Sequence, residues 1–246
     1  MTEQKYSSPP ILEAVIEFRW EKEVETDLLH VASKKLVKLY PHVENEISSS
    51  FTVEDMAVRK KEIKTTAKKF TSETGLENVI LRPSALTVIK MAPYDGWESF
   101  VAKAKKIFID VKKATKIKKL SRCSVRFINR IDIPTEESGM IDIDDYLTIS
   151  VSVPKDDFPA LLQYKTEFNI VLDDGASATV KTGSAPPEVL NNLSIWLDID
   201  VIALHGLPQK EDQIWEKLEA LRGHKNKIFE TIVTDKTRAL FSSGGT

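Results

Sequence analysis

Residues 97–133 read WESFVAKAKKIFIDVKKATKIKKLSRCSVRFINRIDI, and the hydrophobic period changes in the middle of this stretch. In the first part, apolar residues recur at spacings of three and four with lysines between them, which predicts an amphipathic helix. From about residue 120, every second side chain lies on one mostly apolar face, which predicts a half-buried strand that Pro134 ends. The stretch therefore predicts a helix that leads into a strand.

Upstream of this stretch, the sequence predicts a strand, a helix and two or three more strands. Residues 11–20 alternate between apolar and polar side chains, so they predict a strand with one buried face. A helix capped by Asp27 and ended by Pro41 follows. The next strands are expected at about 51–70 and 78–92, on either side of a turn around Thr74-Gly75.

Downstream, the same order returns loosely. A short helix is expected over residues 144–147 and a long helix from about Lys210. Between them, the sequence Asp173-Asp174-Gly175 predicts a hairpin turn, because glycine accepts a positive φ. The three strands around this turn and after it are expected at about 162–172, 176–183 and 193–204.

Both halves of the chain thus read strand, helix, strands, helix. We expect an α+β fold, in which an antiparallel sheet is built from two loosely similar halves and helices pack on one face. Residues 1–118 form a basic half and residues 119–246 an acidic half that ends in the long helix. Because no long Gly/Ser linker separates them, one compact unit is expected.

Composition sets the class of protein. The chain has 246 residues and is 41% hydrophobic, which excludes intrinsic disorder. No uncharged apolar run reaches the ~18–20 residues of a membrane span, and the N-terminus lacks the layout of a signal peptide. The single cysteine, Cys123, cannot form an internal disulfide, so the reducing cytoplasm is the expected location.

The net charge of −2 hides an asymmetry along the chain. Residues 1–130 carry a net charge of +8 and residues 131–246 a net charge of −10. Between Lys103 and Arg130 there are eight lysines and three arginines against one acid, Asp110. Such a molecule offers one region to anions and another to cations or basic proteins.

The basic stretch supplies the candidate residues for anion or nucleic-acid binding. A lysine-rich helix face followed by arginines at four-residue spacing on one strand face could follow a row of phosphates. The alternative is an ordinary solvated helix face, with the arginines paired to acids of the second half. The candidates are Lys103, Lys106, Lys113, Lys118, Lys119, Arg122, Arg126 and Arg130.

Two aspartates offer the strongest acidic pattern. In a strand, Asp198 and Asp200 project from the same face about 6–7 Å apart, a spacing at which two carboxylates can hold a divalent cation. No third ligand can be placed beside them from the sequence, and a strand with a solvated face shows the same pattern. We therefore predict no catalytic residue, no metal ligand and no cofactor, and keep this pair as a weak metal candidate.

A set of landmarks along nearly the whole chain is similar to a sporadically distributed, largely uncharacterised bacterial family of about 250 residues. The resemblance implies a genomic context in mobile elements, among toxin–antitoxin and phage-defence loci, and implies no active site. The landmarks are Pro9-Pro10-Ile11, Glu13-Ala14-Val15-Ile16, Phe18-Arg19, Gly96-Trp97, Phe100, Arg126-Phe127-Ile128-Asn129-Arg130-Ile131, Ile133-Pro134, Asp145-Tyr146-Leu147, Asp198-Ile199-Asp200, Asn226, Ile228-Phe229-Glu230 and Thr234-Asp235.

The sequence favours a non-catalytic, cytoplasmic protein-binding factor. Such a factor would act as an antitoxin, an immunity protein or an accessory factor of phage defence, by recognising the surface of a partner protein. The alternatives are a nucleic-acid-binding protein that uses residues 103–130, a divalent-metal nuclease built on Asp198 and Asp200, and a ligand cavity between the sheet and the C-terminal helix. A homo-oligomer is left open.

Overall fold

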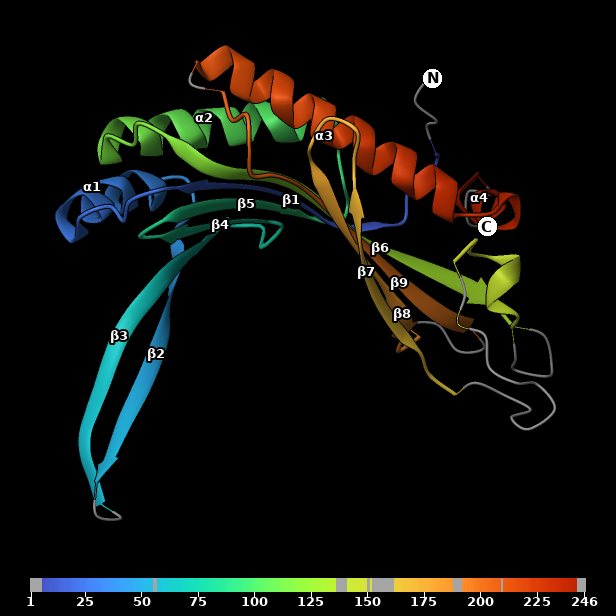
Figure 1. Cartoon of the computed structure of the whole chain (residues 1–246), viewed down its shortest axis with the longest axis horizontal. Coiled ribbons are helices and arrows are strands. Elements are labelled where there is room, and N and C mark those ends of the chain that lie inside the picture. Colours follow the sequence, from blue (N-terminus) through green and yellow to red (C-terminus); the bar gives the residue numbers. More distant parts are fainter. Residues whose placement is uncertain are drawn as a thin grey trace. The chain divides into compact units, whose positions relative to one another are not determined.

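The computed structural model describes residues 6–54, 57–135, 141–149, 151, 162–187, 192–208 and 210–242, and between residues 48 and 65 it describes the backbone alone. The elements follow one another in the order expected for an α+β fold (Figure 1). They are β1 (Ile11–Trp20), α1 (Thr26–Leu36), β2 (His42–Glu54), β3 (Ala57–Thr71), β4 (Glu77–Arg82), β5 (Ala85–Met91), α2 (Trp97–Thr115), β6 (Leu120–Pro134), η1 (Ile143–Asp145), β7 (Lys165–Val171), β8 (Ser177–Ala185), β9 (Asn192–Ala203), α3 (Glu211–Ile232) and α4 (Asp235–Ser242).

The strands form one antiparallel sheet in the order β2-β3-β4-β5-β1-β6-β9-β8-β7. The first strands of the two halves, β1 and β6, are neighbours. The last strand of each half pairs with its first, β5 with β1 and β9 with β6. This repeated order confirms the predicted sheet of two similar halves. Within the described residues, the second half has one strand fewer, and the single-turn η1 stands where the first half has α1.

The chain divides into two compact units. The N-terminal unit comprises Val15–Met91 and Asp95–Cys123, and the C-terminal unit comprises Met1–Ala14, Ala92–Tyr94 and Ser124–Thr246. Both β1 and β6 contribute residues to each unit.

In the N-terminal unit, α1 and α2 lie side by side on one face of the strands (Figure 1). The rings of Phe18 on β1 and Phe108 on α2 are 4.3 Å apart and both are fully buried. The prediction that Asp27 caps α1 is wrong, because Glu25 is the N-cap residue and Asp27 lies in the first turn. There its carboxylate interacts favourably with the positive end of the helix dipole.

The strands between α1 and α2 are divided differently from the prediction. The structure has four of them, and β2 begins at His42, well before residue 51. The side chains from His42 to Ile47 are exposed, so no apolar face marks the beginning of β2 in the sequence. The predicted turn is confirmed, and Gly75 adopts a φ of +74° there.

In the C-terminal unit, α3 packs on β9 through buried leucines and isoleucines, and α4 follows after a short break (Figure 1). The prediction of a long C-terminal helix is confirmed. The hairpin between β7 and β8 is confirmed as well, with Gly175 at a φ of +77°. Among the helices that the structure describes, none combines the length and the apolar character that a membrane crossing needs.

Candidate functional site

The three arginines of the predicted stripe lie on one face of β6. The alternate residues Val125, Phe127 and Ile131 are buried in the core, so the arginines point to the opposite face. The sequence therefore placed Arg122, Arg126 and Arg130 on a common face correctly. Their partners decide what this face can bind.

Arg126 is held by Asp198 of the neighbouring strand β9. Its Nε and Nη2 donate hydrogen bonds of 2.7 and 2.6 Å to the two oxygens of the carboxylate. The hydrogen bonding of Arg126 to Asp198 raises the pKa of Arg126 against the effect of burial, and the charges of Asp198, Asp200 and Glu13 raise it further. The guanidinium therefore lies among carboxylates, with its geometry fixed by a bidentate pair.

Arg130 and Arg122 also lie beside acids. Arg130 donates from Nε to Asp132 at 2.9 Å and from Nη2 to the carbonyl of Pro186 at 2.9 Å and the hydroxyl of Ser194 at 3.2 Å. The Nε of Arg122 lies 3.6 Å from Glu17. Because Asp132 and Asp198 belong to the acidic half, this arrangement matches the alternative in which the arginines pair with acids.

The weak metal candidates have different surroundings. The side chain of Asp198 is only 6% exposed, and its carboxylate is paired with Arg126. Asp200 is half-buried on the same face of β9. The guanidinium of Arg126 thus already places a positive charge beside these two aspartates. Within the part of the chain that the structure describes, no three His, Cys, Asp or Glu side chains gather as a metal site would require.

The lysine candidates divide into two groups. Lys106 and Lys113 on α2, and Lys118 and Lys119 after it, are exposed. Lys103 instead contacts Glu77 of β4, and its Nζ lies 3.9 Å from Asp95. Lys103 is exposed too, so its contacts with acids, and not its burial, separate it from the other four.

Helix α1 adds lysines that the sequence analysis missed. It lies beside α2 and, with the turn after it, exposes Lys34, Lys35 and Lys38. None of the acids in the described residues pairs with these lysines or with Lys106, Lys113, Lys118 and Lys119. Three apolar side chains are also exposed in this region, Val31 (47%), Val37 (41%) and Leu39 (50%). We call Lys34, Lys35, Lys38, Lys106, Lys113, Lys116, Lys118 and Lys119 the lysine surface.

The lysine surface has a partial structural explanation. Lys34 and Lys35 lie in the last turn of α1, and Lys113 lies in the last turn of α2. Cations at a helix C-terminus are stabilised by the helix dipole. This accounts for three of the eight lysines and leaves the other five, together with the exposed apolar side chains, without an explanation in the fold. The sequence does contain a sign of the basic character of α1, since Lys34, Lys35 and Lys38 lie within five residues.

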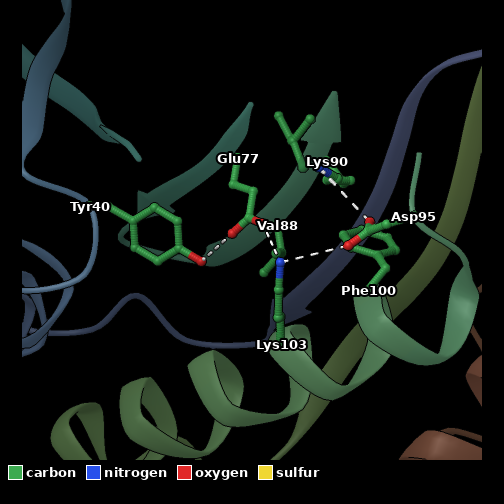
Figure 2. A pocket seen from close by; sticks show the side chains of 8 residues that line it. Tyr40, Glu77, Val88, Lys90, Asp95, Phe100 and Lys103 are labelled. Atoms are coloured by element: carbon green, nitrogen blue, oxygen red, sulfur yellow. Dashed lines mark hydrogen bonds and ion pairs between the residues drawn. The ribbon is translucent and has the colours of Figure 1, made fainter. Parts of the chain in front are cut away.

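A second charged cluster joins α1, α2 and the strands of the N-terminal unit (Figure 2). The hydroxyl of Tyr40 donates to Glu77 at 3.4 Å, and Glu77 also accepts from Lys103. Asp95 stands between Lys103 and the buried Lys90, 3.9 Å from each Nζ. The cluster therefore connects the segment after α1, the strands β4 and β5, and helix α2.

The pKa values of the cluster follow from these contacts. Burial, followed by the charge of Glu77, raises the pKa of Tyr40 to about 12. The hydrogen bond to Glu77 raises the pKa of Lys103. The cavity that these side chains enclose has a volume of about 10 Å³, room for one water molecule. A cavity of this size has no space for a substrate. The paired charges around it fit a structural role, in which they hold the surrounding elements together.

The comparisons with known proteins give little. No family model matches the chain, and no curated protein matches it. Among the solved structures, 15 chains match. One is Methanococcus jannaschii TBP, which is 12% identical to this chain, covers 91% of this chain and 97% of its own, and has a TM-score of 0.30. At that TM-score and identity the likeness carries no argument.

Proposed function

We propose that the protein is a non-catalytic, cytoplasmic binding factor that recognises an acidic partner protein. Its role would be that of an antitoxin, an immunity protein or an accessory factor of phage defence. The observation that carries this proposal is the lysine surface, where the packed helices α1 and α2 and the segments after them expose cations without acidic partners in the described residues, together with Val31, Val37 and Leu39. Lysines of this kind steer an acidic surface into contact.

The apolar side chains favour a protein partner over a nucleic acid. Protein interfaces combine an apolar centre with a polar rim, and the three apolar residues among lysines provide that combination. Arginine is the residue best suited to bind phosphate, because its guanidinium can donate two parallel hydrogen bonds to one phosphate group. The arginines of β6 are instead engaged with Glu17, Asp132 and Asp198. A nucleic acid would therefore meet lysines alone.

The proposal is tested by co-expression with the product of the neighbouring gene. We expect a stoichiometric complex on size-exclusion chromatography. The triple variant Lys106→Glu, Lys113→Glu, Lys118→Glu should weaken this complex at least about ten-fold, because three charge reversals at an interface remove roughly 1.4 kcal/mol or more.

A matched control reverses the same number of exposed lysines away from the lysine surface. The variant Lys22→Glu, Lys165→Glu, Lys210→Glu should keep the affinity of the wild type. Absence of any complex, or equal weakening by both variants, would contradict the proposal. Tight binding of a 20-nucleotide DNA that collapses between 50 and 200 mM salt, and that only the first variant loses, would point to nucleic acid instead.

A further inference from the structure

A groove in the C-terminal unit lies between α3 and β7 and has a volume of about 350 Å³. One wall is a stripe of α3 with the spacing of a single helix face: His224, Lys227, Ile228, Thr231 and Ile232. The other wall is β7 and the turn after it, chiefly Phe168, Ile170 and Leu172. The volume falls within the range of ordinary ligand sites.

The two walls have the same length. Eight residue steps along α3, from His224 to Ile232, span about 12 Å. Four extended steps, from Phe168 on β7 to Leu172 just after it, span about 13 Å. An extended peptide of four or five residues therefore matches the length of both walls of the groove.

The strand that forms the wall is an edge of the sheet. β7 is last in the strand order, and β8 is the strand that pairs with it among the described residues. Its side chains alternate in exposure, with Thr166, Phe168 and Ile170 half-buried toward α3 and the residues between them exposed. The outer backbone groups of such a strand form a ready row of hydrogen-bond donors and acceptors.

We propose that the groove holds an extended segment of a partner protein, which adds to the sheet as a strand beside β7. Main-chain hydrogen bonds to β7 would hold the segment. Every second side chain would enter the groove and pack against Phe168, Ile170 and Ile228. A lipid-like ligand could use the apolar walls, but it would leave the backbone row of β7 unused. This proposal does not depend on the lysine surface, which lies in the other unit.

Charge defines the segment further. Lys227 is exposed at the groove and has no acidic partner among the described residues. His224 at the same wall already has an acid beside it, because its Nε2 lies 3.3 Å from Asp174. We therefore expect a segment with alternating apolar residues and an acidic residue that meets Lys227.

The test is a selection of phage-displayed random ten-residue peptides on the full-length protein. We expect enriched peptides to alternate apolar residues and to carry an acid. In fluorescence polarisation, Ile170→Lys should weaken their binding at least ten-fold, and Asn169→Lys, on the opposite face of β7, should change it less than two-fold. Every second peptide amide can be N-methylated in two alternative patterns. The pattern that removes the donors to β7 should abolish binding, and the other pattern should not.

A second variant guards against loss of the fold in Ile170→Lys. Lys227→Glu changes an exposed residue, and it should weaken the acidic peptides while the far-ultraviolet circular dichroism stays that of the wild type. The proposal fails if no alternating peptide is enriched, if binding survives both variants, or if neither of the two N-methylation patterns weakens binding. It also fails if sodium dodecanoate saturates the groove while peptides do not bind. None of these outcomes bears on the complex described above.

Discussion

Arg126 on β6 and Asp198 on β9 form two hydrogen bonds across neighbouring strands, at 2.7 and 2.6 Å, and the two partners are unequally buried. The Asp198 side chain is 6% exposed and that of Arg126 is 41% exposed. If the arginine is removed, a buried carboxylate loses its main partner. If the aspartate is removed, a half-exposed guanidinium keeps Glu13 and Asp200 nearby.

This inequality predicts different costs for the two single substitutions. Arg126→Met should lower the free energy of unfolding by about 3 kcal/mol, because it leaves a charge buried. Asp198→Asn should cost only about 1 kcal/mol, since the arginine reaches water and other acids. Urea denaturation at neutral pH measures both. An Asp198→Asn cost equal to or above that of Arg126→Met would contradict this account of the pair.

Two glycines are predicted to respond to alanine in opposite directions. A Cβ at Gly183 on β8 would lie 2.7 Å from the Tyr164 carbonyl and 2.9 Å from the Trp196 indole nitrogen. Gly183→Ala should therefore destabilise the protein by about 1–3 kcal/mol. Gly223 lies within α3 with open space around it, so Gly223→Ala should stabilise by about 0.5–1 kcal/mol. Thermal unfolding of both variants checks the pair, and a shared sign would be inconsistent with it.

Acid stability should depend on the turn between β7 and β8. The hydrogen bond from Lys217 is the main reason that the pKa of Asp174 is lowered to about 2, and His224 contributes. A lowered pKa stabilises the fold above the ordinary value near 4, and this stabilisation is lost as the pH falls from about 4 to about 2. Asp174→Asn should flatten the decline of the unfolding free energy in that window. Asp173→Asn, which leaves these contacts intact, should keep the wild-type slope.

Alkaline stability should depend on Tyr40. Its pKa is raised to about 12 in the fold, so the neutral phenol is favoured there. The corresponding stabilisation is present below pH 10 and is lost as the pH rises from about 10 to about 12. Tyr40→Phe should reduce this loss, measured as the change in urea midpoint between pH 8 and pH 11. Part of the slope should remain, because the pKa of Tyr6 is raised to about 12 as well. An unchanged slope would exclude Tyr40 as a source.

The elements with one strong hydrophobic period could be predicted from the sequence. The predicted strand over residues 11–20 coincides with β1, and the helix that begins at Trp97 is α2. Each buries one face against a core, so its pattern records its packing. β2 lacked such a pattern because its first side chains are exposed, and its stability comes from hydrogen bonds to β3.

The site was less predictable because its contacts cross the sheet. Arg126 and Asp198 are 72 residues apart in sequence, and only the order β6-β9 brings them together. The sequence showed both residues on exposed strand faces, which left phosphate binding, metal binding and mutual pairing open. Likewise, the contribution of α1 to the lysine surface depends on the packing of α1 beside α2. No local pattern carries that information.

Hydrogen exchange on the complex with the neighbouring gene product tests the central claim most directly. Because the lysine surface is proposed to dock the acidic partner, the exposed amides at the ends of α1 and α2 should exchange more slowly in the complex, together with those of residues 116–119. Protection confined to the arginine-bearing face of β6, with these helices unchanged, would contradict the claim.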